Sequence, residues 1–318
     1  MGKELPDFAK VAFMTVSYRC NAEKIIVWCD KISYPSVSEF KLEGLEAQLV
    51  DVGFLIEKLS HLSVQEQSKL GEIFEITGTE RNIADSDAVR RARGDLIRLL
   101  ILYHYGGVYL DCDTLVLKDL SPLLNQPGFM GYEKPVWSIN SKADFFYKFF
   151  KGPALEVLRF LCLQVGFGYR ISHSLSSLFP NALNQAVLGF TPCNGDVLLA
   201  ITTILDMDLS YTKKTLVLGP HLWQKIEPQM ISTKIYPFTS FYPLGPRFAR
   251  HYFRSRTNSA RALNTLIRKK ETYVPHLCLS SSTRISKQSI EYCLANPGEN
   301  MYTYAVSEFF ESIKELKA

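Results

Sequence analysis

The stretch that decides the fold runs from residue 94 to residue 113 and reads GDLIRLLILYHYGGVYLDCD. The segment Val89 to Gly107 predicts a helix, because apolar residues recur at helical spacing in it, namely Leu96, Leu99, Leu100 and Tyr103. Glycine commonly ends helices, so Gly106-Gly107 predicts a stop. Val108 to Leu110 then predicts a short strand, and Asp111 and Asp113 follow at its carboxyl end.

Outward from this stretch, helical and strand patterns alternate, which favours an α/β fold. Helices are predicted at Phe8 to Cys20, Leu155 to Val165, Ala182 to Leu188 and Val306 to Leu316. Strands are predicted at Lys24 to Cys29, a buried parallel strand, and at Glu46 to Val52. A strand tail and turn are predicted at Thr114 to Leu124, and short late strands or loops at Leu216 to Leu218, Ile235 to Pro237 and Tyr273 to Leu277.

The chain has three Asp-x-Asp pairs, and about one is expected by chance at this composition. They are Asp85/Asp87, Asp111/Asp113 and Asp206/Asp208. Only Asp111/Asp113 follows a short apolar strand preceded by two glycines, and ligands of open α/β sheets bind at the carboxyl ends of strands. In an extended segment the two carboxylates point to the same side, where they can share a hard divalent ion. An acidic turn is the alternative interpretation.

The same stretch resembles the signature of the D-x-D sugar-transferase family. That family includes α-1,4-galactosyl- and α-1,4-N-acetylglucosaminyltransferases, the yeast initiating α-1,6-mannosyltransferase and, by a shared signature, the glucosylating domains of clostridial toxins. Its pattern is an Asp and an Arg one helical turn apart, a glycine pair, a Tyr and the D-x-D. This chain has the expected residue at every position of the pattern, and the segment Ser86-Asp87-Ala88-Val89 that precedes it also belongs to the resemblance. The resemblance implies a GT-A-like, Rossmann-type nucleotide-sugar transferase fold.

The resemblance also implies roles for individual residues. Asp113 is the expected direct metal ligand and Asp111 reaches the ribose or the water of the metal, so both are expected catalytic residues. Asp95 and Arg98 are expected at the donor sugar and phosphate, together with Gly107 and Tyr109. A surface ion pair is the alternative for Asp95 and Arg98.

Weaker similarities to the family follow downstream. Asn184 lies in a segment that resembles the Asn-bearing helix of the family and is expected at the donor. Leu218-Gly219-Pro220 resembles a T-G-P turn, and Phe241-Tyr242-Pro243 resembles an F-Y-P. His276 resembles the late His that approaches the metal or the diphosphate, with a structural histidine as the alternative. The Trp that usually follows this His is missing here.

The resemblance also bears on the organisation of the chain. We expect one glycosyltransferase domain over residues 1–318, with a nucleotide-sugar-binding half at 1–125 and an acceptor-side half at 126–318. The first strand of the family, which lines the uracil pocket, has no counterpart before Phe8. The expectation is therefore a fold that lacks its first strand, with base binding and activity in question.

Composition excludes several classes of protein. The 318 residues are 47% apolar and 21% charged, as in a globular protein with a full core. A net charge of +4 does not favour a nucleic-acid partner. The seven cysteines form no C-x-x-C, which excludes a zinc knuckle and leaves the redox compartment open. The sequence shows neither a membrane-spanning run nor a signal-peptide core, so it predicts a cytosolic chain, or a Golgi-lumen chain if an N-terminal anchor is missing.

A basic stretch from Arg247 to Lys270 has eight Lys or Arg and no acid, with Phe248, Tyr252 and Phe253 between the cations. One interpretation is a surface for an acceptor or an anionic membrane. The interpretation we favour is a solvated helix face near the donor diphosphate. The three tryptophans, Trp28, Trp137 and Trp223, offer sugar-stacking surfaces, although burial explains Trp28 better.

Three functions compete. The leading hypothesis is a retaining, Mn²⁺- or Mg²⁺-dependent transferase that moves a hexose or N-acetylhexosamine from a UDP-sugar to a glycan, lipid or protein acceptor. Retention is implied by the resemblance alone. The second is a truncated or inactive module that binds sugar nucleotides. The third is a nucleotidyl- or phosphotransferase, which would normally have a phosphate loop of the form GxxxxGK[ST], and this chain has none.

Overall fold

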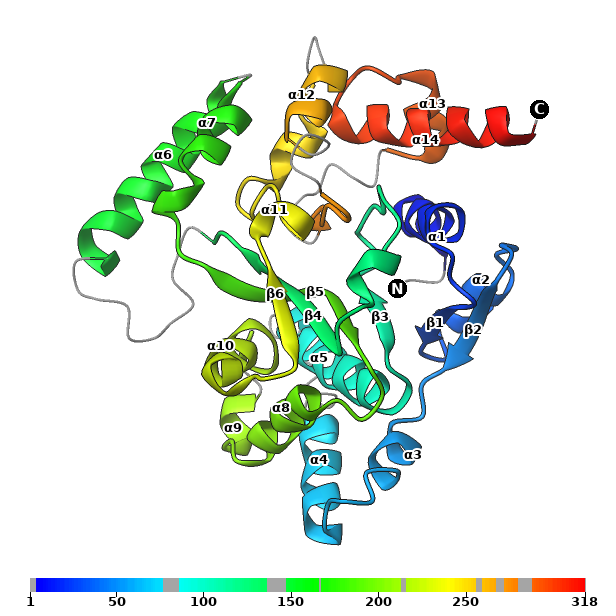
Figure 1. Cartoon of the computed structure of the whole chain (residues 1–318), viewed down its shortest axis with the longest axis vertical. Coiled ribbons are helices and arrows are strands. Elements are labelled where there is room, and N and C mark those ends of the chain that lie inside the picture. The colour runs from blue at the N-terminus through cyan, green and yellow to red at the C-terminus, as the bar shows by residue number, and fades with distance from the viewer. Residues whose placement is uncertain are drawn as a thin grey trace.

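The computed structural model describes eight stretches of the chain: residues 4–76, 86–135, 147–165, 167–212, 216–255, 259–266, 272–279 and 288–317. They form two open sheets surrounded by helices (Figure 1). The α/β class predicted from the sequence is therefore confirmed. No helix in these stretches is long and apolar enough to cross a membrane.

The strands are β1 (Ile25–Cys29), β2 (Leu45–Leu49), β3 (Gly107–Leu110), β4 (Gly128–Glu133), β5 (Ala182–Phe190) and β6 (Thr233–Tyr236). The helices of the first half are α1 (Asp7–Arg19), α2 (Tyr34–Ser38), α3 (Val52–Glu57), α4 (Val64–Ile76) and α5 (Ser86–Tyr105). Those of the second half are α6 (Gly152–Gln164), α7 (Gly168–Ser174), α8 (Gly195–Leu205), α9 (Leu209–Thr212), α10 (Leu222–Ile226), α11 (Phe238–Phe241), α12 (Ser259–Leu266), α13 (Ile290–Ala295) and α14 (Met301–Lys317). Short 3₁₀ and π turns are η1 (Ser121–Leu123), η2 (Tyr147–Lys151), η3 (Ser176–Leu178), η4 (Val217–His221), η5 (Glu227–Gln229) and η6 (Ala249–Phe253).

The larger sheet has the strand order β3-β5-β4-β6. β5 is antiparallel to both of its neighbours, and β6 is parallel to β4. The smaller sheet is the parallel pair of β1 and β2. β3 pairs with the second half of β5, so the middle of β5, at Ala186 and Val187, lies beside the end of β3, where the Asp-x-Asp begins.

The largest hydrophobic core lies between α5, α8, α10 and the sheet. The apolar stripe of α5 is fully inside it, with Leu96, Leu99 and Leu100 at 0% exposure. Trp223 of α10 stacks on Phe190 of β5 in the same core. This packing fixes α5 against the sheet, and the polar residues at 95 and 98 are held there with it.

Several predicted elements are confirmed, α1, β1, β3 and β6 within one or two residues and α5, α6 and α14 with starts three to five residues earlier than predicted. The sequence placed the helices α1, α5, α6 and α14 and the strands β1, β3 and β6 correctly. The predicted strand at Glu46 to Val52 is β2, three residues shorter at its end. Two late predictions were wrong or incomplete: Leu216 to Leu218 leads into the helical turn η4, and Thr114 to Leu124 contains a single bridge residue and η1.

The prediction of a helix at Ala182 to Leu188 was wrong, because this segment is β5, the strand between β3 and β4. β5 is buried on both faces, with Leu183 and Leu188 in the core around α5 and Ala186 and Val187 in the core on the opposite face. A strand buried on both faces loses the alternation of apolar and polar residues that identifies a strand. Its apolar residues then fall by coincidence at helical spacing.

None of the seven cysteines, all of which are described, forms a disulfide.

Candidate functional site

The two glycines after α5 turn the chain sharply into β3. Gly106 and Gly107 both have positive φ, of 63° and 92°, which other residues rarely adopt. A Cβ on Gly106 would lie 2.6 Å from Cδ of Pro192, so this position also excludes any side chain on steric grounds. The short strand that follows can therefore begin directly at the helix end and deliver Asp111 to the sheet edge.

The Asp-x-Asp does not continue as an extended segment, contrary to the expectation from its spacing. Leu110 ends β3, and the amide of Thr114 donates to the carbonyl oxygen of Asp111 over 3.2 Å, which closes a turn. The two carboxylates nevertheless approach the same side chain, His276.

His276 reaches the turn because its own segment runs antiparallel to the chain after Asp113. The amide of Leu117 donates to Tyr273, that of Leu115 donates to Pro275, and that of Leu277 donates to Asp113. These residues lie more than 150 positions apart in the sequence, so no local pattern could show the pairing. The predicted short element at Tyr273 to Leu277 is thus a bridged segment beside the turn.

Three side chains form a cluster at this point. Nε2 of His276 lies 3.2 Å from Oδ1 of Asp113 and 3.9 Å from Oδ2 of Asp111. Their side chains are 12%, 17% and 27% exposed, so all three remain accessible at the surface. One acceptor atom from each lies within 4.8 Å of the others. The cluster is thus neither closed off nor turned away from solvent.

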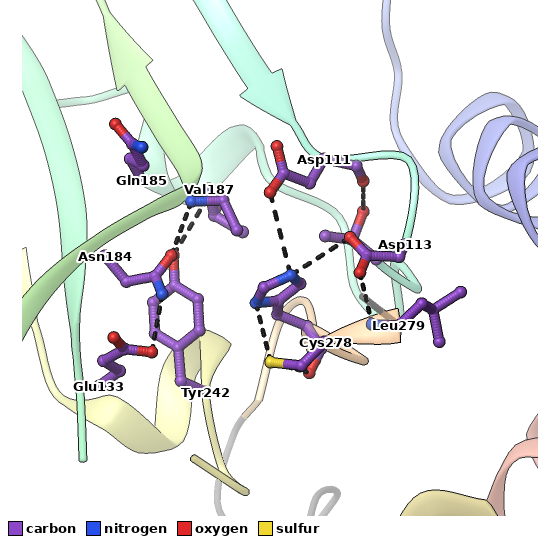
Figure 2. Close-up of polar contacts among 12 residues, drawn as sticks. Asp111, Asp113, Glu133, Asn184, Gln185, Val187, Tyr242, Cys278 and Leu279 are labelled. Carbon is purple, nitrogen blue, oxygen red and sulfur yellow. Dashed lines mark hydrogen bonds and ion pairs between the residues drawn. The ribbon is translucent and has the colours of Figure 1, made fainter. Parts of the chain in front are cut away.

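The cluster fits a divalent cation by donor chemistry and by spacing. Bonds of about 2.1 Å to one octahedral ion put neighbouring donor atoms about 3 Å apart, close to the 3.2 Å seen here. Two carboxylates and an imidazole suit an ion that accepts both oxygen and nitrogen. The second oxygen of Asp113 accepts a 2.8 Å hydrogen bond from the amide of Leu279, which orients the carboxylate toward His276 (Figure 2).

The protonation states at the cluster follow from these contacts. Burial raises the pKa of Asp113, but His276 and the Leu279 amide outweigh it, so this pKa lies below its ordinary value. Burial lowers the pKa of His276, but Cys278 and Asp113 outweigh it, so this pKa lies well above its ordinary value. Nδ1 of His276 lies 3.3 Å from Sγ of Cys278, which fixes the ring on its other side.

Arg98 links α5 to this cluster. Its guanidinium lies 3.2 Å from Asp95 and 3.4 Å from Asp111, and it donates to the carbonyl of Gln185 over 2.8 Å. It also packs over the ring of Tyr109, 4.5 Å from the centroid. Asp95 is 4% exposed and Arg98 is 9% exposed, so the alternative of a surface ion pair was wrong. The pair is buried because its helix face lies against β5.

The carboxylate of Asp95 contacts two segments that follow it in the chain. Oδ1 of Asp95 accepts a 2.6 Å hydrogen bond from the Gln185 amide. A Cβ on Gly219 would lie 2.8 Å from Oδ2, so the Leu218-Gly219-Pro220 turn closes over the carboxylate. Burial raises the pKa of Asp95, opposed by Arg98 and Gln185. Two segments that weakly resemble the family, the one around Asn184 and the turn at Leu218-Gly219-Pro220, thus both contact the buried carboxylate of Asp95.

Gly107 and Tyr109 occupy different positions relative to the cluster. The hydroxyl of Tyr109 donates to Oδ1 of Asp111 over 2.7 Å, so it orients that carboxylate. Gly107 pairs with Phe190 at the opposite end of β3, and its left-handed backbone serves the turn. The donor-binding role of either residue stays a prediction.

Asn184 lies on β5 and is held on both sides of its amide. Its Nδ2 donates to Oε2 of Glu133 over 2.7 Å, and its Oδ1 accepts from the amide of Ala186 over 2.8 Å (Figure 2). Glu133 is the last residue of β4 and is 5% exposed. Burial raises its pKa to about 7, although the Asn184 hydrogen bond and the charge of His276 lower it. Sequence reasoning missed Glu133, although a lone acid at the end of the apolar run Gly128 to Tyr132 was a detectable signal.

A comparison with known protein families matches the part of the chain that contains the Asp-x-Asp. Residues 12–130 match the family described as the glycosyltransferase sugar-binding region containing DXD motif. Inositol phosphoceramide mannosyltransferase 3 of Schizosaccharomyces pombe is 38% identical over 61 residues, 19% of this chain and 17% of the relative. Inositol phosphoceramide mannosyltransferase 1 of the same yeast is 38% identical over 61 residues, 17% of this chain and 19% of the relative. The chain thus spans less than a fifth of each relative.

Two solved structures are similar at a lower level. The PaToxG glycosyltransferase has a TM-score of 0.36 at 10% identity, covering 97% of this chain and 83% of its own. The ligand-free glycosyltransferase domain from the YGT toxin has a TM-score of 0.31 at 13% identity, covering 86% and 74%. Neither score defines a shared fold. The match of residues 12–130, which is less than half of the chain, agrees with the resemblance read from the motif: this part of the chain is similar to the sugar-binding region of glycosyltransferases that contains the DXD motif.

Proposed function

We propose that the chain is a metal-dependent glycosyltransferase that moves a hexose or N-acetylhexosamine from a nucleotide-diphosphate sugar to a glycan, lipid or protein acceptor. The observation that carries the proposal is the convergence of Asp111, Asp113 and His276 beside the buried pair of Asp95 and Arg98. A UDP-sugar donor and retention of configuration rest on the motif resemblance. The two yeast relatives are named for mannosyl transfer, so mannose belongs in the donor screen.

The roles of the residues follow from what each can still contact. In this proposal Asp113 and His276 are the direct ligands of Mn²⁺ or Mg²⁺. A bound divalent ion supplies positive charge to the departing diphosphate. Asp111 has Oδ1 committed to Tyr109 and Arg98, and its Oδ2 faces the cluster, which suits the ribose or a water of the metal.

In the proposed site, the buried charges of Asp95 and Arg98 hold the groups that would face the donor in place. Arg98 holds Asp111 and Asp95 in place, and its own position is fixed by Gln185 and Tyr109. Because these groups are ordered before any ligand binds, they cost little reorganisation when charge develops on the leaving group. Asn184, fixed by Glu133, is the proposed contact on the β5 side.

The test is a donor screen with the purified chain. UDP-glucose, UDP-galactose, UDP-GlcNAc and GDP-mannose are each incubated with Mn²⁺, and hydrolysis and binding are measured. We expect turnover of at least one donor, lost on addition of EDTA. If no donor binds or turns over, the transferase proposal fails, and binding without turnover would favour the inactive module.

The metal assignment is tested separately with two matched variants. Asp113→Asn removes the charge of the proposed ligand at constant size. Asp206→Asn makes the same change in a different Asp-x-Asp, at an exposed position that ends α8. We expect Asp113→Asn to lower Mn²⁺ affinity at least about tenfold while Asp206→Asn leaves it unchanged. Full metal-dependent turnover by Asp113→Asn would refute the assignment.

A further inference from the structure

Helix α6 exposes a large apolar surface, which we call the α6 apolar face. It consists of six side chains of η2, α6 and the residue before α7, each 56–61% exposed: Phe149, Phe150, Val157, Phe160, Leu161 and Phe167. Figure 1 shows α6 and α7 at one edge of the molecule, away from the larger sheet. Patches of contiguous exposed apolar residues mark interaction sites in soluble proteins.

The composition of α6 explains why a covering partner is required. Leu155 and Cys162 pack into the core on one side, so the helix already has one buried face. Its two charged residues, Glu156 and Arg159, pair with each other. The opposite face carries Val157, Phe160 and Leu161, with no charge among them. Apart from this charged pair, α6 is thus apolar on its exposed side as well as on its core side, and a soluble amphipathic helix normally has charged or polar residues on the exposed side.

Cations lie along the edges of this face. Arg254 donates to the carbonyls of Leu163, Gln164 and Val165 at the end of α6. Arg247, which is 55% exposed, lies 3.6 Å from Glu156 at the middle of the helix. Both belong to the basic stretch, whose aromatic residues Phe248, Tyr252 and Phe253 are buried in the core under α6. The structure thus joins the basic stretch to the α6 apolar face.

The charge around the face is almost entirely of one sign. Among the described residues from 149 to 180, the cations are Lys151, Arg159 and Arg170, and Glu156 is the only acid. The described residues of 247–266 carry four arginines and no acid. Interfacial helices of membrane-bound proteins combine phenylalanine and leucine on one face with lysine and arginine around it, and the cations attract anionic lipids.

We propose that the α6 apolar face docks on a bilayer that contains anionic phospholipids. Its phenylalanine and aliphatic side chains would enter the boundary between headgroups and acyl chains, while the arginines at its edges would contact the headgroup phosphates. Phenylalanine is common at protein interfaces too, so the cations at the edges of the face are what favour an anionic bilayer over a protein partner. This inference does not depend on the transferase activity.

The test is co-sedimentation of the full chain with phosphatidylcholine vesicles, with and without phosphatidylserine. Val157→Asp places a charge in the centre of the face. Val64→Asp is the matched control, since Val64 is also an exposed valine on a helix, α4, in another part of the fold. We expect Val157→Asp to lower vesicle binding at least about tenfold and Val64→Asp to leave it unchanged, with thermal midpoints equal in both.

A second pair of variants tests the charge. Arg250→Glu reverses an exposed cation on η6, and Lys225→Glu makes the same change on α10. We expect stronger binding to the vesicles with phosphatidylserine, weakened by Arg250→Glu and by salt but not by Lys225→Glu. The proposal is overturned if wild type binds neither vesicle or if Val157→Asp binds like wild type. It is also overturned if sedimentation velocity shows that the face joins two copies of the chain without any vesicle binding.

Discussion

Replacing Glu133 by glutamine removes one titrating group from the interior at almost constant shape. Glu133 is 5% exposed, and its carboxylate accepts a hydrogen bond from Asn184. Burial raises its pKa from the ordinary 4.5 to about 7. The glutamine amide oxygen can accept the same hydrogen bond, so Glu133→Gln isolates the effect of the charge.

The sign of the pH dependence follows from proton binding. Between pH 4.5 and pH 7 the folded protein keeps a proton on Glu133 that the unfolded chain has already released. Stability therefore falls as pH rises through this window, and the loss is complete above about pH 7. A difference of 2.5 pKa units (7 minus 4.5), at about 1.4 kcal/mol per unit, amounts to about 3 kcal/mol.

The assay is urea unfolding of wild type and Glu133→Gln at several pH values from 4.5 to 8. The free energy of unfolding of the variant, minus that of wild type, is expected to rise by about 3 kcal/mol across the series. Other titrating groups cancel in this difference. Glu72→Gln, at an exposed position on α4, is the control and should give a flat difference. A flat difference for Glu133→Gln as well would refute the assignment of Glu133 as a buried group with a raised pKa.

Two further stability predictions use the same assay at one pH. Gly106→Ala should cost about 2 kcal/mol, because alanine must adopt a φ near 63° and clash with Pro192; Gly71→Ala, in α4 with open space around it, should instead stabilise by about 1 kcal/mol. Equal effects of the two alanines would contradict the strained turn. Asp95→Asn should cost about 3 kcal/mol, because Arg98 loses a buried partner, whereas Asp51→Asn, an exposed helix cap, should be near neutral. A neutral Asp95→Asn would mean that Asp111 alone satisfies Arg98.

The parts of the fold that the sequence predicted well are continuous in the chain. In α5 and β3 the apolar stripe, the glycine pair and the acidic pair follow one another within about 25 residues, and each has a local physical cause. The helix needs one apolar face, the turn needs glycine, and the strand end presents the carboxylates. The same local logic predicted α1, β1 and α6.

The errors arise where distant segments decide the outcome. The sequence pattern of β5 predicts a helix, and only its position between two strands, buried on both faces, shows that it is a strand. That error hid why Asp95 and Arg98 are buried, because the face of α5 that carries them is covered by Gln185 of β5. The approach of His276 to Asp113 likewise depends on the pairing of 273–277 with 113–117.

The charge balance of the site favours a cation over an anion at its accessible end. Asp95, Asp111 and Asp113 are three carboxylates held within one network of contacts, and Arg98 is the only permanent cation among its described members. Asp95 and Arg98 offset each other inside the fold, which leaves two carboxylates at the accessible end with one imidazole. Such an end attracts a cation more strongly than a phosphate. If the proposed function holds, we therefore expect the nucleotide sugar to bind weakly without Mn²⁺ or Mg²⁺, because the ion would supply the positive charge that a diphosphate needs there. A binding titration of the donor with and without Mn²⁺ checks this, and equal affinity in both would contradict it.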